Sequence, residues 1–123
     1  MTTKIESFTD LIAWKEAHKL TIMVYQITRN FPKEELFALT SQLRRAVVSV
    51  AANIAEGFSR RTFPDKKQFF TMALGSLTET QNYFLLARDL GYLSKENFDE
   101  VAKQSVLVSK LVNGLVRSCS RRT

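Results

Sequence analysis

The chain has 123 residues, of which 45% are hydrophobic and 24% are charged, and its formal net charge at pH 7 is +6. This length allows one ordinary domain, residues 1–123, and excludes two, while the composition excludes an intrinsically disordered chain. Residues 1–9 lack the apolar core of a signal peptide, no apolar run approaches the ~20 residues that cross a bilayer, and a single cysteine excludes an internal disulfide. We therefore expect a soluble cytoplasmic protein that does not contact membranes.

The first two predicted helices span about residues 9–30 and 34–58. In the first, apolar and small side chains recur at three- and four-residue steps, and Phe31-Pro32 ends the pattern because the residue before a proline is disfavoured in the α region. In the second, Gly57 lies near the end of the pattern and predicts a stop. The apolar stripe of this second helix consists of Leu39, Leu43, Ala46, Val50 and Ile54.

The last two predicted helices span about residues 63–90 and 95–118. Thr62 and Asp65 form the spacing of a capping box at the start of the third helix, and Ser94 is a good N-cap for the fourth. Side chains of the fourth helix step 3-4-3-4-3-4, which is the heptad spacing of a bundle seam. These side chains are Phe98, Val101, Ser105, Val108, Val112, Leu115 and Cys119.

No strand-like alternation competes with these helices, and the connections between them are only a few residues long. Short connections make consecutive helices antiparallel neighbours. The sequence therefore predicts an all-α protein, an up-down-up-down antiparallel four-helix bundle. Each helix is expected to be on the order of 35 Å long at 1.5 Å per residue.

The middle of the second helix is more apolar than a bundle helix requires. Between residues 46 and 55 only a serine and an asparagine are polar. Val48, Ala52 and Ala55 therefore lie outside the main stripe, on a side that a four-helix monomer leaves uncovered. Exposed patches of this kind usually mark interfaces, so we expect these three residues to contact another copy of the chain in a homo-oligomer.

Polar side chains form one line along the same helix, at 3-4-4-3 spacing: Gln42, Arg45, Ser49, Asn53 and Glu56. On the third helix, Ser76 and Glu79 have similar spacing and are placed to face this line. Because buried polar groups must be paired, we interpret the line as a hydrogen-bonded network that fixes helix register or subunit packing. A catalytic pair of carboxylates, Glu56 and Glu79, is the less favoured alternative.

The sequence lacks the usual signatures of catalysis. Its one histidine, His18, lies on a helix flank, and the Glu-x-x-His pairs of di-metal bundles are absent. There is no P-loop, dinucleotide-binding or nucleophile-elbow motif. Cys119 lies on the predicted seam and is expected to pack as a small core side chain. We expect no enzyme activity, no metal and no cofactor.

Positive charge is concentrated in residues 60–67 and 117–123, each with a net charge of +3. In the predicted topology these two segments meet at one end of the bundle. The basic side chains are candidate phosphate ligands for RNA or DNA, and the alternative is a solvated loop and a frayed tail. Phe63, within the first segment, is a candidate for base stacking or for a helix staple. The seven candidates are Arg60, Arg61, Lys66, Lys67, Arg117, Arg121 and Arg122.

Several motifs together resemble a known family. They are Phe8-x-x-Leu11-x-x-Trp14-x-x-Ala17, Phe31-Pro32-x-Glu34, Gln42-x-Arg44-Arg45-Ala46-x-x-Ser49-x-x-x-Asn53-Ile54-Ala55-Glu56-Gly57, Arg60, and Ala73-x-Gly75-Ser76-x-x-Glu79. Over about residues 5–118 the chain resembles the bacterial four-helix bundle protein family, whose members include proteins encoded in intervening sequences of 23S rRNA genes. Ten positions match the family motif, and none is an established active-site residue in that family: Gln42, Arg44, Arg45, Ser49, Asn53, Glu56, Gly57, Arg60, Ser76 and Glu79.

The resemblance implies an up-and-down bundle that forms ring-shaped homopentamers. The family is also similar to the accessory variability determinant of diversity-generating retroelements, a basic pentameric bundle that works with a reverse transcriptase and its RNA. Two functions are therefore expected. The first is an oligomer that binds RNA or DNA mainly through phosphates. The second is a scaffold or adaptor whose basic end docks an acidic protein partner, for example a polymerase-like enzyme.

Overall fold

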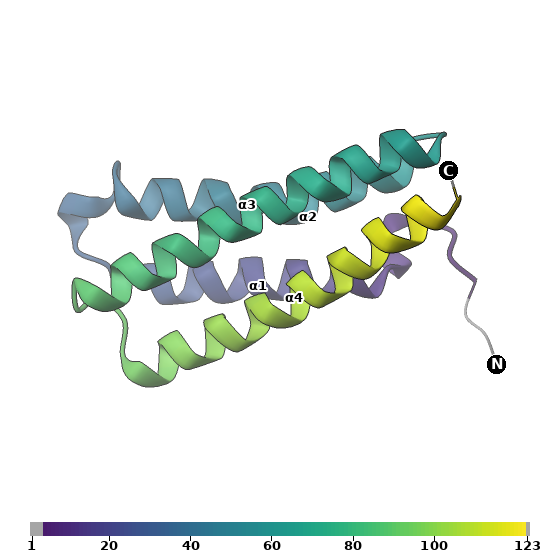
Figure 1. Cartoon of the computed structure of the whole chain (residues 1–123). Coiled ribbons are helices and arrows are strands. Elements are labelled where there is room, and N and C mark those ends of the chain that lie inside the picture. The colour runs from purple at the N-terminus through teal and green to yellow at the C-terminus, as the bar shows by residue number, and fades with distance from the viewer. Residues whose placement is uncertain (1–3, 123) are drawn as a thin grey trace.

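Four α-helices make up most of the chain in the computed structural model, which describes residues 4–122. The predicted domain also includes residues 1–3 and 123, which lie outside the described residues. No strand occurs between residues 4 and 122. Figure 1 shows the helices lying side by side, with the start of α1 and the end of α4 at the same end. The helices are α1 (Ile12–Thr28), α2 (Leu39–Ser59), α3 (Phe63–Asp89) and α4 (Lys95–Arg122), and short 3-10 helices at Phe8–Asp10 and Lys33–Glu35 precede α1 and α2.

The helices pack in a closed cycle, in which α1 contacts α2, α2 contacts α3, α3 contacts α4, and α4 contacts α1. Every helix contributes fully buried side chains, as expected for helices with one apolar stripe each. None of the described helices is both long and apolar enough to cross a membrane. The largest fully buried apolar side chains are Leu20, Val24, Leu43, Val47, Val50, Ile54, Leu77, Phe84, Val101, Val108 and Val112.

Contacts between distant segments define the two ends of the bundle. At one end, the Arg122 guanidinium lies over the Phe63 ring at 5.5 Å from its centroid, so the end of α4 meets the start of α3. At the other end, the Tyr92 hydroxyl donates a 2.8 Å hydrogen bond to Glu35 Oε2, and the Tyr92 ring centroid lies 5.5 Å from that of Phe31. The end that contains Phe63 is named the basic end below, and the end that contains Tyr92 is named the opposite end.

The starts of α3 and α4 are capped by the residues that the sequence indicates. Thr62 Oγ1 accepts a hydrogen bond from the Asp65 N–H at 3.2 Å, and Ser94 Oγ accepts one from the Asn97 N–H at 3.0 Å. In the described structure the Thr62 N–H donates no return bond to the Asp65 carboxylate, so only half of the predicted capping box forms. One satisfied N–H at each start is the usual contribution of an N-cap.

The second predicted helix begins too early, since α2 starts at Leu39 and not at residue 34. Lys33–Glu35 forms a separate 3-10 helix, and Ala38, with φ −124° and ψ −106°, interrupts the helical backbone. The Glu35 carboxylate substitutes for an N-cap, because its Oε1 accepts the Leu39 N–H at 3.4 Å. Phe37 consequently lies outside the core and is 92% exposed.

The other helix boundaries differ less from the prediction. α1 begins at Ile12 and not at residue 9, because Ser7 and Asp10 form a capping box around the preceding 3-10 helix and Leu11 is extended. α3 ends one residue before the predicted residue 90. α4 continues to Arg122, a full turn beyond the predicted residue 118.

Gly57 lies inside α2 and does not end it, so the predicted stop is wrong. A Cβ at this position would lie 2.7 Å from Phe70 Cε1 and 3.2 Å from the Lys66 carbonyl oxygen. The Phe70 ring is buried, so it has little room to move. The glycine is explained by the close approach of α2 and α3 near the basic end.

Candidate nucleic-acid interface

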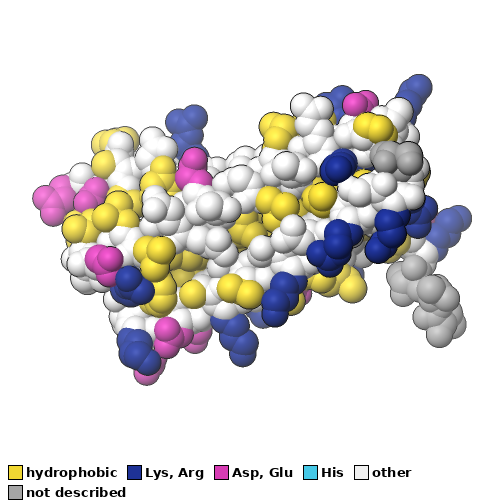
Figure 2. All heavy atoms as spheres, viewed as in Figure 1, with side chains coloured by type: hydrophobic (Ala, Val, Ile, Leu, Met, Phe, Trp, Pro, Cys, Tyr) yellow, Lys and Arg dark blue, Asp and Glu magenta, His cyan; other side chains and the backbone are white. Residues whose placement is uncertain are grey.

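Seven basic side chains gather at the basic end from the α2–α3 connection, the first turns of α3 and the last turns of α4. These segments and the last turn of α2 contain only two carboxylates, those of Glu56 and Asp65. Figure 2 shows dark-blue side chains concentrated at this end and magenta side chains concentrated at the opposite end. The seven basic residues are Arg60, Arg61, Lys66, Lys67, Arg117, Arg121 and Arg122.

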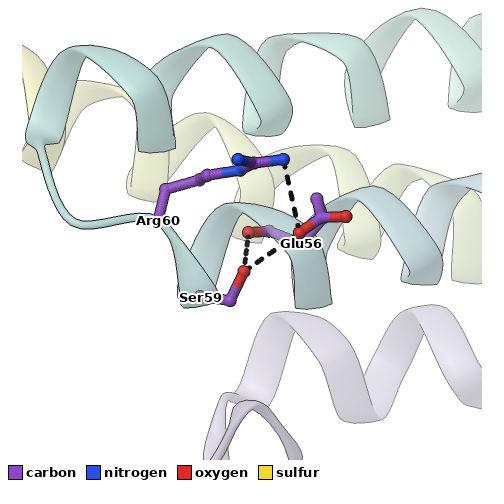
Figure 3. Close-up of polar contacts among 3 residues, drawn as sticks. All are labelled: Glu56, Ser59 and Arg60. Carbon is purple, nitrogen blue, oxygen red and sulfur yellow. Dashed lines mark hydrogen bonds and ion pairs between the residues drawn. The ribbon is translucent and has the colours of Figure 1, made fainter.

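Arg60 has partners within the subunit, as Figure 3 shows. Its Nη2 lies 3.5 Å from Glu56 Oε2 in an ion pair in which both side chains are nearly half exposed. The Ser59 hydroxyl is placed to donate to the same carboxylate oxygen at 3.0 Å or to the Glu56 carbonyl oxygen at 2.7 Å. The Arg60 guanidinium also lies 4.4 Å from the centroid of the Phe69 ring. Since an exposed i,i+4 ion pair contributes only about 0.3–0.5 kcal/mol, the arrangement mainly positions Arg60.

Lys66 and Arg122 also have structural roles. The Lys66 ammonium donates a 2.6 Å hydrogen bond to the Phe58 carbonyl oxygen, and so satisfies one of the carbonyl groups left free at the end of α2. It also lies 5.5 Å from the centroid of the Phe58 ring. Arg122 covers the half-buried Phe63 ring, which packs against the core. Phe63 therefore acts as a packing residue at the start of α3, and its ring is not open for base stacking.

The remaining four cations of the basic end, Arg61, Lys67, Arg117 and Arg121, are exposed. None forms a salt bridge with an acidic group of residues 4–122. Arg61 and Arg121 are 60 residues apart in the sequence, and both lie at this end because the last turn of α4 contacts the start of α3. Unneutralised cations gathered in one place create a local potential that attracts polyanions.

The Cys119 thiol is affected by cations of two helices at the basic end. Burial raises the pKa of this thiol, and the positive charges of Lys66, Arg122 and Lys67 oppose that shift more weakly. Cations of both α3 and α4 therefore act on one buried sulfur atom. The raised pKa keeps the thiol neutral at neutral pH, as the prediction of a small core side chain requires.

In the middle of the polar line on α2, Ser49 Oγ and Ser76 Oγ form a 2.9 Å hydrogen bond that joins α2 to α3. Asn53 Nδ2 donates to the Ser49 hydroxyl at 3.0 Å and to the Ser49 carbonyl oxygen at 2.9 Å. Gln42 and Arg45, nearer the start of α2, are exposed. The hydrogen-bonded network is therefore shorter than the line of polar residues suggests.

Glu56 and Glu79 are not brought together by the fold. Starting from the contact between Ser49 and Ser76, Glu56 lies seven residues toward the basic end and Glu79 lies three residues toward the opposite end. At 1.5 Å per residue they are separated by about 15 Å along the helix axes. Paired carboxylates of hydrolytic enzymes lie roughly 5–10 Å apart, so the geometry gives no support to a catalytic pair.

Arg44 has a structural role that the sequence did not reveal. Its Nε donates a 2.8 Å hydrogen bond to Thr28 Oγ1, and its guanidinium lies 4.7 Å from the centroid of the Tyr25 ring. Both partners belong to α1, so Arg44 links α2 to α1. The contact depends on how the two helices pack, which sequence spacing alone does not specify.

The predicted interface residues lie mostly at the surface of the subunit. Val48 is 43% exposed, Ala52 is exposed, and Ala55 is half-buried. Val48 lines a hollow together with residues of α1 and of the segment before α2, including Tyr25 and Phe37. Both of these aromatic side chains are exposed in the subunit. This side of the subunit therefore presents apolar and aromatic groups to its surroundings.

No described group of three or more histidine, cysteine or acidic side chains is placed to hold a metal ion between residues 4 and 122. The His18 ring instead stacks on Trp14 with a centroid separation of 4.7 Å. Both residues lie near the start of α1, and His18 is exposed. This stacking gives the histidine a packing role at the surface.

The chain resembles known proteins in its fold and in its sequence family. No curated protein matches the sequence significantly. A crystal structure of a protein of unknown function from the S23 ribosomal protein family of Bacteroides thetaiotaomicron VPI-5482 matches with a TM-score of 0.77 and 19% sequence identity. The match covers 85% of this chain and 98% of that chain, and at this identity it establishes the fold alone. The model of the 23S rRNA-intervening sequence protein family matches residues 9–114. Since this match spans most of the sequence, the chain belongs to the 23S rRNA-intervening sequence protein family.

Proposed function

We propose that the protein is a non-enzymatic, homo-oligomeric up-down-up-down bundle that binds RNA or DNA through the basic end. The observation that carries this proposal is the convergence of four exposed cations that have no acidic partner: Arg61, Lys67, Arg117 and Arg121. Structural demands of the subunit explain Arg60, Lys66 and Arg122, but not these four. Side chains of this kind bind phosphates without reading base sequence.

Lys66 and Lys67, neighbours in the second turn of α3, differ in their partners. The Lys66 ammonium donates a hydrogen bond to the Phe58 carbonyl oxygen and so contributes to the subunit itself. Lys67 is exposed and forms no salt bridge or hydrogen bond in the described structure. Its charge is therefore available to a ligand.

The decisive experiment neutralises the four exposed cations together, as Arg61→Gln, Lys67→Gln, Arg117→Gln and Arg121→Gln. Nuclease-treated protein is titrated into labelled duplex DNA and structured RNA at several salt concentrations. Loss of four phosphate contacts is expected to reduce the slope of log affinity against log salt by about 3.6, and the affinity by on the order of 10²–10³-fold at 0.1 M salt. Circular dichroism checks that the helices remain.

A matched control removes the same amount of charge at the opposite end, as Arg29→Gln, Lys33→Gln, Arg88→Gln and Lys95→Gln. This control should retain nearly all of the affinity, because its residues lie away from the proposed site. Equal losses in both variants would show that net charge and not the basic end governs binding. A wild-type protein that binds no nucleic acid at low salt would overturn the proposal, and an acidic protein that co-purifies after nuclease treatment would then favour the adaptor function.

Self-association forms the second part of the proposal. The side of α2 that carries Val48 and Ala52 presents apolar groups beside Tyr25, Phe37 and Arg44, and aromatic and arginine side chains are enriched at the centres of interfaces. The family resemblance suggests a ring of five copies. Such a ring would carry roughly 30 positive charges and present five copies of the basic end.

The oligomer is tested by Val48→Glu and Ala52→Glu, each measured by light scattering coupled to size exclusion. A buried, unpaired carboxylate costs several kcal/mol, so either change should shift the mass toward the 14.1 kDa monomer. Asn82→Glu, at an exposed position of α3, serves as the control and should leave the mass unchanged. A native mass in both α2 variants would show that the interface lies elsewhere.

A further inference from the structure

α4 carries a line of positive charge that continues beyond the basic end. After Glu100 the helix contains no acidic residue, and its exposed cations Lys103, Lys110, Arg117 and Arg121 are spaced by seven, seven and four residues. With 3.6 residues per turn, these spacings place the four side chains within about 40° of one line along the helix. The line is about 27 Å long at 1.5 Å per residue. In Figure 2 a row of dark-blue side chains follows α4 toward the basic end.

The four cations of this α4 line have no acidic partner within residues 4–122. The salt bridges of the described structure join Arg60 to Glu56, Arg88 to Asp89, and Lys95 to Asp99. Lys95 lies at the start of α4, where acidic residues are still present. The helix therefore changes along its length from a mixed, paired surface to a purely positive and unpaired one. A straight row of cations on a helix is complementary in charge and shape to a straight row of phosphates.

Gly114 lies within the same line, between Lys110 and Arg117. A glycine in a helix interior costs about 0.5–1 kcal/mol relative to alanine. Packing does not require it here, because a Cβ would meet only the Arg117 Nη2 atom, at 3.9 Å. Its backbone also needs no positive φ. The absence of a side chain lets a ligand approach the helix closely at the middle of the line.

Three aromatic rings beside the α2–α3 connection lie under the protein's own cations. Lys66 lies over Phe58, Arg122 over Phe63 and Arg60 over Phe69, at 5.5, 5.5 and 4.4 Å from the ring centroids.

Two other aromatic side chains of this end, Phe8 and Trp14, are half-buried and contact each other, and His18 stacks on Trp14. The exposed rings of Tyr25 and Phe37 line the hollow beside Val48. Proteins that bind single strands usually gain about 1–3 kcal/mol for each base stacked on an open ring. The α4 line carries no aromatic residue between Lys103 and Arg121, which favours a ligand whose bases are already stacked in a duplex.

We infer that the phosphate-binding surface extends from the basic end along α4 through Lys110 to Lys103, and that its ligand is double-stranded nucleic acid held lengthwise against this helix. This inference rests on the proposed function and specifies its substrate class. The line of 27 Å corresponds to roughly eight base pairs at 3.4 Å per base pair. Contacts to the backbone alone make the binding independent of sequence.

An acidic amphipathic helix is the competing ligand for the first part of this line. Lys103 and Lys110, with Lys19 of α1, border a groove that also contains the exposed apolar side chains Val106 and Leu107. Such a partner accounts for the two lysines but not for their alignment with Arg117 and Arg121. A duplex accounts for all four, because it carries one negative charge per 1.7 Å of its axis.

The test is the double variant Lys103→Gln and Lys110→Gln in the otherwise native protein. Fluorescence anisotropy measures its affinity for a 20-base-pair duplex and for single strands of the same length, across a range of salt concentrations. Two lost phosphate contacts should reduce the duplex salt slope by about 1.8, a difference that is measurable against the wild type. The wild type should bind the duplex at least about tenfold more tightly than either single strand. Both lysines are exposed, so circular dichroism should be unchanged.

The matched control, Arg29→Gln and Lys33→Gln, removes two charges at the opposite end and should leave the duplex salt slope within about 0.3 of the wild-type value. If the double lysine variant keeps the wild-type slope while the four-residue variant of the basic end loses it, the extension along α4 is wrong and the proposed function stands. Equal affinity for single strands and duplex would overturn the choice of ligand. If the wild type binds none of the probes, the proposed function itself fails.

Discussion

The two ends of the bundle carry opposite charge. At each end an N-cap hydroxyl starts the next helix, Thr62 at the basic end and Ser94 at the opposite end. The α2–α3 connection and the adjoining turns of α2, α3 and α4 at the basic end have seven cations and two carboxylates, and the segment before α1 at the same end adds Lys4, Glu6 and Asp10. The opposite end has four cations, Arg29, Lys33, Arg88 and Lys95, and six carboxylates, Glu34, Glu35, Asp89, Glu96, Asp99 and Glu100.

The comparison of the two ends shows whether the fold itself requires positive charge where two helices are joined. Because the opposite end closes the bundle with an excess of carboxylates, a positive charge is not needed to join two helices of this protein. The charges of the opposite end are partly paired, as in the bridges of Arg88 with Asp89 and Lys95 with Asp99. The unpaired cations of the basic end therefore call for an explanation outside the subunit, which the proposed phosphate ligand supplies.

The largest expected effect concerns the packing of the basic end, and it follows from Gly57→Ala. The added methyl group would lie 2.7 Å from a buried Phe70 ring atom, so either the ring or the helix must shift. Overpacking of this kind costs about 1–3 kcal/mol in the free energy of unfolding. Urea denaturation measures it, with Gly75→Ala in α3 as the control. A Cβ at Gly75 meets no atom within 4 Å, so that change should stabilise the monomer by about 0.5–1 kcal/mol.

A smaller effect is expected at the opposite end, from Gly91→Ala. This glycine has φ +80°, and it ends α3 in a Schellman motif in which the Tyr92 N–H donates to the Ala87 carbonyl oxygen at 2.9 Å. There is open space for a Cβ, so the cost comes from the backbone alone and should be about 1 kcal/mol. Gly91→Asn should cost less, because asparagine tolerates this conformation better. Equal stability of Gly91→Ala and the wild type would contradict the explanation.

Sequence periodicity predicted the helices well where local chemistry determines the boundary. The N-caps Thr62 and Ser94 and the helix α3 agree with the sequence because the capping residue and the helix it caps are neighbours in the chain. The start of α2 was predicted wrongly, since Glu35 acts as its cap and is itself held by Tyr92, 57 residues away. A contact of that range is invisible to a local pattern.

The candidate site was only partly predictable for the same reason. The clustering of positive charge could be read from the sequence, and the fold brings the two segments to one end. What the sequence did not show is that Lys66 caps a backbone carbonyl group, or that Arg60 and Arg122 cover aromatic rings. The acid-free part of α4 is visible in the sequence, but its cations form a line only once the helix boundaries place them on one face.

The smallest expected effect is a difference in how the two ends respond to pH. At the basic end, the Asp10 carboxylate accepts hydrogen bonds from the Glu6 N–H at 2.9 Å and the Ser7 N–H at 3.0 Å, and these bonds lower its pKa below the ordinary 3.8. A carboxyl group with a lowered pKa in the folded state stabilises that state above its ordinary pKa. The stabilisation is lost as the pH falls through the lowered value. Acid should therefore loosen the segment before α1 first.

At the opposite end the pKa shift is upward, so stability is lost at high pH and not at low pH. The hydrogen bond to Glu35 raises the pKa of the Tyr92 hydroxyl above the ordinary 10.0, so the folded state favours the neutral phenol. The stabilisation is present below pH 10 and is lost as the pH rises through the raised value. Ultraviolet difference absorbance of tyrosinate should show one tyrosine that titrates late in the wild type and is missing in Tyr92→Phe.

Acid loosening at the basic end has its own reporter. Trp14, the one tryptophan, contacts the Phe8 ring edge-on at 5.3 Å, so its fluorescence follows the segment that Asp10 caps. Asp10→Asn should remove most of the acid transition of this signal while leaving the tyrosine titration unchanged. Tyr92→Phe should do the reverse. If either variant altered both the fluorescence transition and the tyrosine titration, the two ends would be coupled through the core. Their responses to pH could then not be treated as independent.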